Sequence, residues 1–259
     1  MIKFFRKIRQ RLLAENPPKG QAGKFSKYLL YAIGETVLVV IGILIALSIN
    51  NWNEDQKERK TQIRYLERMH TEIQLDTTYL RQKILRAQDE QESYYYFIHS
   101  MYDVQTTKED FIKLISSVVW DAEDLILQDE TFTEITTSGK LDLIRNDQLK
   151  ESIIDYYRNY AIADRHITEM NLTSIDLFKF FVPILSKYYD VMSHIYDQEQ
   201  MFDPKGLEFI NDPDSDEFRR LEGTAGFYSF KHSIYEQYYK DLLLNATKLL
   251  KQIQHEIKQ

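Results

Sequence analysis

The sequence has no cysteine and contains little glycine or proline. Its 259 residues include 8 Gly, 5 Pro and no Cys. Without thiols the chain forms no disulfide, holds no thiolate zinc site and has no cysteine nucleophile. Scarce Gly and Pro disfavour a β-sandwich with many turns and favour long helices. The composition therefore predicts an all-α protein, long enough to bury a sizeable core in one or two domains.

Motifs that carry chemistry are also missing from the sequence. The six histidines form no HExxH motif and no i, i+4 pair, which argues against a zinc site. Neither a P-loop nor a GxSxG motif occurs. Residues 212–216 begin like a calcium loop, but Glu217 and Gly223 stand where that loop needs glycine and glutamate. We therefore predict a non-enzymatic protein with no cofactor and no metal site.

The charges are distributed unevenly along the chain. The formal net charge of −7 argues against a general nucleic-acid binder, because neutralising phosphates requires a basic face. Residues 1–28 carry eight basic side chains and one acid, whereas residues 51–259 carry 38 acids against 25 bases. The acidic part is therefore not expected to bind anionic lipid or DNA tightly.

A long apolar run separates the basic and acidic parts. Residues 29–49 read LLYAIGETVLVVIGILIALSI, in which Glu35 is the one charged residue. At a rise of 1.5 Å per residue this run spans about 31 Å, the thickness of the hydrocarbon core of a bilayer. Aromatic side chains flank it at Tyr28, Tyr31 and Trp52, where interfacial belts lie. We predict a transmembrane helix over residues 28–51 that anchors the chain in the lipid bilayer.

A cleaved signal peptide is the less favoured interpretation of this region. Residues 46–48 provide the minimal cleavage signal, but the basic region and the apolar segment are both longer than usual for a signal peptide. The basic excess precedes the span, so the positive-inside rule places residues 1–27 in the cytoplasm and residues 52–259 outside it. Residues 1–13 are amphipathic and basic, and either lie in the lipid interface or only set the topology.

One face of the predicted span carries the candidate site for helix association. Glu35, Val39, Gly42 and Ala46 share this face, and Gly42 with Ala46 forms a small-xxx-small pattern that lets two helices approach closely. A carboxyl group on the same face is either protonated or snorkelling beside an oligomer seam, or it responds to protons or ions.

Two blocks of sequence resemble a known family. They are KYLLYAIGETVLVVIGILIALSINNWNE at residues 27–54 and TFTEITTSGKLDLIRNDQLKESIIDYY at residues 131–157. Both are similar to an uncharacterised family of bacterial single-span membrane proteins with a helical periplasmic domain. The resemblance implies an inner-membrane protein of Gram-negative bacteria, with a cytoplasmic N-terminus and a periplasmic C-terminal domain. It implies no activity.

Residues 52–259 have the pattern of a helical bundle with a long first helix. No Gly or Pro occurs between Glu54 and Met101, which predicts one helix that continues from the span. Thr106–Glu109 is a capping box and predicts a second helix from about Lys108. A short helix at residues 131–137 is expected to stop at Gly139.

Two longer helices are expected in the C-terminal half. Asn146 is the predicted cap of a helix that runs to about Tyr189 with a kink at Pro183. After a loop at residues 195–217, a final helix starts near Phe218 or restarts after Gly226 and continues toward Ile257. We expect an up-and-down bundle in which the first and last helices are adjacent.

The apolar pattern predicts which side chains form the core. In the first helix a seam with steps of three and four is expected at Ile63, Leu66, His70, Ile73, Thr77, Leu80, Ile84, Ala87, Gln91, Tyr94, Ile98 and Met101. In the last helix the expected face is Phe227, Phe230, Ile234, Tyr238, Leu242, Leu249 and Ile253. The acids between Asp121 and Glu130 are interpreted as a solvated helix end. Adjacent tyrosines predict an aromatic core or, alternatively, a ligand groove.

This layout leads to one functional hypothesis and one alternative. We expect a membrane-anchored envelope protein whose periplasmic helical bundle serves self-assembly, as a homo-oligomer, or binding of a membrane-protein partner. The alternative is a single-span subunit of an ion-driven or signalling membrane complex that uses Glu35. Single-span subunits of proton-driven stator complexes look similar in layout, although their periplasmic domains are mixed α/β.

Overall fold

The computed structural model describes residues 21–103, 107–181 and 208–258. Within these residues the regular structure is helical, in five α-helices and two short 3-10 helices, η1 (Leu141–Leu143) and η2 (Glu208–Asn211). The prediction of an all-α protein is therefore confirmed. The chain divides into one unit that ends at Lys60 and a second that begins at Thr61. The predicted amphipathic segment at residues 1–13 lies outside the described residues.

Helix α2 (Gln21–Met101) is the long first helix, and it contributes to both units. In the first unit its large apolar side chains are exposed, as at Val39 and Ile49, which are 57% and 61% exposed. In the part of the chain that the structure describes, α2 is the one helix long and apolar enough to cross a membrane. None of its most apolar window is buried.

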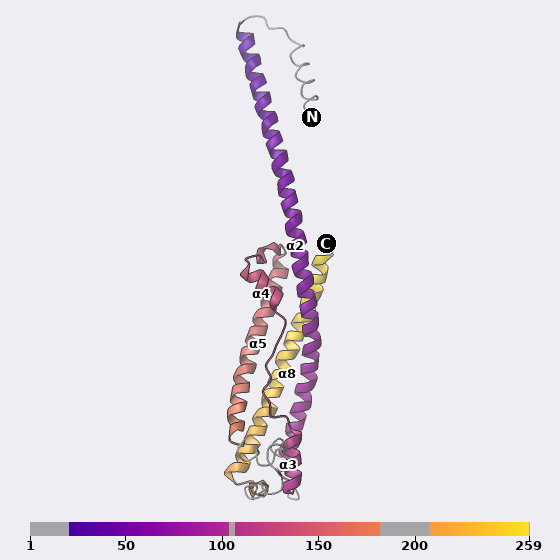
Figure 1. The fold of residues 1–259 in the computed structure, drawn as a ribbon, viewed down its shortest axis with the longest axis vertical. Helices are drawn as coiled ribbons and strands as arrows, with labels where there is room; N and C mark the ends of the chain where they lie inside the picture. Colours follow the sequence, from indigo (N-terminus) through magenta and orange to yellow (C-terminus); the bar gives the residue numbers. More distant parts are fainter. Residues whose placement is uncertain (1–20, 104–106, 182–207, 259) are drawn as a thin grey trace, which may run out of the picture. The chain divides into compact units, whose positions relative to one another are not determined.

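Three long helices form the second unit: α2 from Thr61, α5 (Asp147–Lys179) and α8 (Asp216–Ile257). Figure 1 shows α5 and α8 beside the lower part of α2. Gln62 donates a hydrogen bond to Glu256 over 3.4 Å, and Gln88 bonds Glu236 further along. The first and last helices are therefore adjacent, as the sequence predicts, and they run antiparallel.

An extended segment returns the chain between two short helices. Helix α3 (Lys108–Ser117) and helix α4 (Glu130–Thr137) are joined by residues 118–129, which we call the strap. In Figure 1 the strap runs from α3 back along the bundle to α4. Because this return is made without a long helix, α2 and α5 run parallel, and Tyr156 of α5 bonds Asp76 of α2. The predicted up-and-down order is therefore wrong.

Helix boundaries follow local capping chemistry. The Thr107 hydroxyl accepts the Asp110 N–H at the start of α3, and the Asn146 side chain accepts the Leu149 N–H at the start of α5. Gly139 follows α4 with a φ of +68°, a conformation that glycine adopts without strain. The sequence predicts these three boundaries correctly.

The C-terminal half differs from its predicted boundaries. Helix α5 ends at Lys179, and the expected kink at Pro183 lies outside the described residues, as does residue 189. Helix α8 begins at Asp216 because the Ser215 hydroxyl caps it by accepting the Phe218 N–H. It then passes through Gly226 without a break, so the alternative of a restart at that glycine is wrong.

Most buried side chains of α2 follow a heptad repeat, and Tyr65 and Thr77 are buried outside it. One half of the repeat is the predicted one, Leu66, Ile73, Leu80, Ala87, Tyr94 and Met101. The other half is occupied by Gln62, Met69, Asp76, Lys83, Glu90 and Phe97. For this second half of the repeat the sequence predicts a different set, of which only Thr77 is buried. The predicted set is Ile63, His70, Thr77, Ile84, Gln91 and Ile98. Charged residues occupy the seam because the strap and α8 supply their partners.

The predicted apolar face of α8 is correct only toward the C-terminus. Leu242, Leu249 and Ile253 are buried, whereas Phe230 is 55% exposed. Toward the N-terminus the core positions are held by Tyr228, Lys231, His232, Tyr235 and Tyr239. Phe227, Ile234 and Tyr238 are only half-buried, so this part of the face is rotated by about one residue from the prediction.

We expect residues 55–259 to fold without the apolar segment. The second unit has its own core, in which residues from α2, α5 and α8 pack together. Expressed alone, this part should be soluble and should give a mainly helical circular dichroism spectrum. A spectrum dominated by strand, or aggregation under native conditions, would contradict this expectation.

Candidate functional site

The backbone of the strap is held by side chains of three helices. Between Val119 and Gln128, each backbone hydrogen bond that the structure shows has a side chain as its partner. Carbonyl groups of the strap accept bonds from Tyr79 and Tyr94 of α2, Tyr160 and Asn171 of α5, and Lys231 of α8. Buried backbone groups need such partners, and a segment with no neighbouring strand must take them from side chains.

The spacing of these contacts shows that the strap is nearly fully extended. Tyr94 bonds Val119, and Asp76 bonds Gln128. The 18 steps from residue 76 to residue 94 of α2 correspond to about 27 Å, and the nine steps of the strap reach at most about 30 Å. Within the strap Leu125 is 1% exposed and Ile126 is 66% exposed, the alternation of a strand. The interpretation of this acidic run as a solvated helix end is therefore wrong for Asp121, Glu123 and Asp124. It holds for Asp129 and Glu130, which are exposed at the start of α4.

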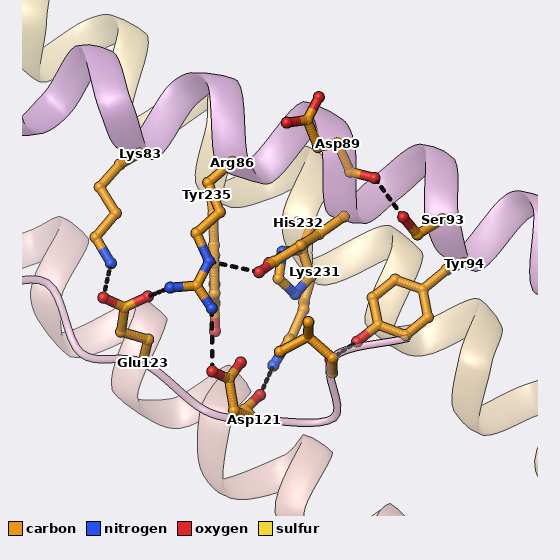
Figure 2. A network of polar contacts seen from close by, with 12 residues as sticks. Lys83, Arg86, Asp89, Ser93, Tyr94, Asp121, Glu123, Lys231, His232 and Tyr235 are labelled. Atoms are coloured by element: carbon orange, nitrogen blue, oxygen red, sulfur yellow. Dashed lines mark hydrogen bonds and ion pairs between the residues drawn. The ribbon is translucent and has the colours of Figure 1, made fainter. Parts of the chain in front are cut away.

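A cluster of charged side chains, which we call the clamp, connects the first half of the strap to α2. Its members are Lys83, Arg86, Glu90, Asp121 and Glu123. Figure 2 shows Arg86 reaching down to the strap, with Nη2 3.0 Å from Asp121 Oδ2 and Nη1 2.6 Å from Glu123 Oε2. The Nε atom of Arg86 lies 2.6 Å from Glu90 Oε1. Lys83 forms an ion pair with Glu123 from the neighbouring turn. The guanidinium group therefore joins three carboxylates, which its planar set of donors allows.

Glu90 connects this cluster to α8. Its Oε2 atom lies 2.6 Å from Nδ1 of His232, and both side chains are buried. Burial pushes the pKa of Glu90 upward, but the hydrogen bonds from His232 and Arg86 outweigh it and hold the pKa below its usual value. In the described residues Nε2 of His232 is buried without a hydrogen-bond partner. Glu90 therefore links α2 to α8 through a buried carboxylate–imidazole pair.

Lys231 of α8 also binds the strap. Its Nζ atom donates to the Asp121 carbonyl over 3.0 Å and to the Ser174 hydroxyl over 3.2 Å, and it lies 4.1 Å from the Tyr228 ring centroid. The residue is only 1% exposed. Burial lowers the pKa of Lys231 to about 8, partly opposed by the charges of Asp121 and Glu90. This lysine therefore ties α8, α5 and the strap together.

The space inside the clamp is small. A cavity of about 20 Å³ is lined by residues that include Lys83, Glu90, Lys231 and His232. That volume has room for a single water molecule and excludes an organic ligand. Over the described ranges, no group of three or more His, Asp or Glu side chains could hold a metal ion. The clamp therefore has the properties of a structural fastening.

A second group of acids fastens the far end of the strap. Asp76 Oδ1 accepts the Gln128 N–H over 2.9 Å, and Oδ2 accepts the Tyr156 hydroxyl over 3.0 Å. Burial raises the pKa of Asp76 to about 6, although both hydrogen bonds act in the opposite direction. Glu72, one turn earlier, accepts the Thr131 N–H and the Thr131 hydroxyl.

The residues predicted as the association site lie elsewhere, in the apolar part of α2. Glu35, Val39, Gly42 and Ala46 are all exposed, and a Cβ atom added at Gly42 would meet no atom within 4 Å. In the single chain they form an unburied helix face. The clamp residues carry no motif. The one signal for them is the seven-residue spacing of Lys83 and Glu90, which Asp76 at the far end of the strap continues.

Comparison with known families places the chain in a family. Residues 35–190 match the family of unknown function DUF6090, and because the match covers more than half of the chain, the protein belongs to that family. The matched range includes the strap, α4 and α5 and ends before α8. It also contains the block at residues 131–157 and most of the block at residues 27–54, the two blocks on which the resemblance rests. No match to this chain was found among curated proteins or among solved structures.

We expect Glu90→Ala to destabilise the second unit. The change leaves His232 buried without its carboxylate and removes one anion from Arg86, and breaking a buried pair typically costs about 3 kcal/mol. Glu92→Ala is the matched control, because Glu92 is exposed on the same helix and its loss should change the free energy of unfolding by less than about 0.5 kcal/mol. Urea unfolding of residues 55–259 measures both. Equal losses for the two variants would show that the clamp does not stabilise the fold.

Proposed function

We propose that this protein is a non-enzymatic, membrane-anchored envelope protein whose helical bundle serves self-assembly or partner binding outside the cytoplasm. The observation that carries the proposal is the exposed apolar segment of α2. Its large side chains, such as Leu38, Ile45 and Ile49, are about half exposed in the single chain. A surface of that size, apolar on all sides of one helix, requires lipid or other apolar helices around it.

The charge distribution supports the orientation. Eight basic side chains precede the apolar segment, and the acidic excess follows it. Basic residues stay on the cytoplasmic side, so the second unit would lie in the periplasm of a Gram-negative cell. The acidic surface would also keep the bundle away from anionic headgroups.

Reporter fusions test this topology. A periplasm-active reporter joined after Gln259 should be active in a Gram-negative host, and a cytoplasm-active reporter at the same place should be silent. The full chain should also stay in the membrane fraction after alkaline extraction, whereas residues 55–259 should not. The reverse reporter pattern would contradict the orientation, and extraction of the full chain would contradict the anchor.

Assembly is proposed to use the face that carries Gly42 and Ala46. Small residues there let two helices approach closely enough for many dispersion contacts. We expect Gly42→Leu to lower the yield of cross-linked full-length protein in lipid by about threefold, since helix association in membranes involves small energies. Leu44→Ala changes the opposite side of the helix and should leave the yield unchanged. Equal yields for wild type and both variants would show that this face does not mediate association.

The same assay addresses the alternative role of Glu35. This carboxyl group shares the helix face of Gly42 but carries the one charge of the apolar run. Glu35→Gln keeps the shape of the side chain and removes its ionisable group. If the protein works as a subunit of an ion-driven complex, Glu35→Gln should give the wild-type cross-linking yield but should not restore growth to a strain that needs the protein. If the carboxyl group only snorkels, Glu35→Gln should match the wild type in both cross-linking yield and growth.

A further inference from the structure

Four carboxyl groups come together where the strap enters α4. Glu72 and Asp76 belong to α2, whereas Asp129 and Glu130 end the strap and begin α4. Asp76 is only 2% exposed. This burial is the main cause that raises the pKa of Asp76, and the charges of Glu72 and Glu130 raise it further. Of the four, Asp76 is buried, Glu72 is half-buried, and Asp129 and Glu130 are exposed, so solvent screens part of the repulsion between them. The repulsion that acts on Asp76 depends on how many of the four groups are ionised.

The two α2 carboxyl groups bind the backbone at the junction. Asp76 accepts the N–H of Gln128, and Glu72 accepts the N–H of Thr131 over 3.3 Å. Since the two acids are one helical turn apart, they grip the end of the strap and the first turn of α4 together. Loosening one of these bonds would loosen the connection between α2 and α4.

The groups around Asp76 come from every neighbouring element. Helix α5 contributes three tyrosines, of which Tyr156 bonds Asp76 and Tyr160 bonds the backbone of Leu127. The third, Tyr157, is buried, and in the described residues its hydroxyl has no hydrogen-bond partner. Burial raises the pKa of Tyr157, and the charges of Glu72, Asp76, Asp129 and Glu130 raise it further. The Tyr157 hydroxyl is therefore a hydrogen-bond donor that lies within the field of the same four acids.

Helix α8 and Arg68 of α2 complete the surroundings. Between the contacts of Gln62 with Glu256 and of Gln88 with Glu236, the buried side chains of α8 are neither acids nor cations. They are Tyr239, Leu242, Ala246, Leu249 and Ile253. The charge of Glu72 acts on Arg68 of α2, whose guanidinium group is bound to Glu134 at 2.6 Å. The positive charge on this side is thus held by a carboxylate outside the junction.

We propose that the junction between the strap and α4 is a proton-operated latch, closed while Asp76 is protonated and loosened when it ionises. The protonated group keeps Oδ1 as the acceptor for Gln128 and can donate through Oδ2 to the Tyr156 hydroxyl. The ionised group places another negative charge in a buried site beside Glu72 and Glu130. The latch is thus tighter in acid, whereas ordinary salt bridges weaken there.

The raised pKa of Asp76 sets the pH range. Its value of about 6 in the folded chain lies above the usual 3.8, so the folded state holds this proton more tightly than the unfolded state. The stabilising contribution is fully present below pH 4 and is lost as the pH rises through 6. This inference does not depend on the proposed membrane topology.

Hydrogen–deuterium exchange of the full chain in detergent micelles tests the latch. After correction for the intrinsic exchange rate, protection of the amides in residues 119–131 should fall about tenfold between pH 5 and pH 8. Amides of α8 near Ala246 should keep their protection. In Asp76→Asn the strap should show no such transition. Protection that does not change with pH in the wild type, or an unchanged transition in Asp76→Asn, would overturn the proposal.

Two further variants keep the test decisive if Asp76→Asn does not fold. Glu72→Gln removes one of the charges that oppose the ionisation of Asp76. The pKa of Asp76 should therefore fall, and the midpoint of the exchange transition should move to lower pH. Asp89→Asn, exposed on the same helix, should retain the wild-type midpoint. A midpoint that stays in place or rises in Glu72→Gln would overturn the proposal.

Discussion

The need to satisfy the backbone of the strap is the constraint on which the bundle depends. An extended segment against helices has no ladder partner, so its carbonyl and N–H groups must meet side chains or stay unpaired at a cost. Tyr79, Tyr160 and Asn171 meet this need with neutral groups, and Asp76 and Lys231 meet it with ionisable ones. Polar groups therefore belong inside this bundle, at positions that an ordinary helical core would fill with Leu or Ile.

This constraint explains how far the sequence predicts the fold. The all-α class, the long first helix, the caps at Thr107 and Asn146, and the glycine stop after α4 all depend on local chemistry, and all are confirmed. One half of the α2 seam is also predicted, because residues such as Leu66 and Leu80 are apolar. The other half depends on partners distant in the sequence, and apolar periodicity cannot identify buried charges such as Lys83 and Glu90.

The errors in the C-terminal half have a similar origin. Hydropathy ranks Phe230 above Tyr228, yet the structure buries the tyrosine, whose hydroxyl bonds the Ser174 carbonyl. A tyrosine fits a polar core because it combines a large apolar ring with a donor at its tip. The parallel order of α2 and α5 could not be predicted either, since the acidic residues of the strap have the composition of a surface segment. The clamp joins α2 to the strap and, through Glu90, to α8. Only these tertiary contacts, and no local sequence pattern, define it.

The return of the chain through the strap has a consequence for how the protein folds. The bonds that complete the bundle join residues far apart in sequence, 80 positions for Asp76 with Tyr156 and 194 for Gln62 with Glu256. During synthesis the strap emerges before Asn171 and Lys231, so its backbone waits for two helices that do not yet exist. Distant contacts slow folding because chain entropy is lost before they form. Although it is made of helices, this domain is thus expected to assemble late and at the slower pace of proteins with long-range pairing.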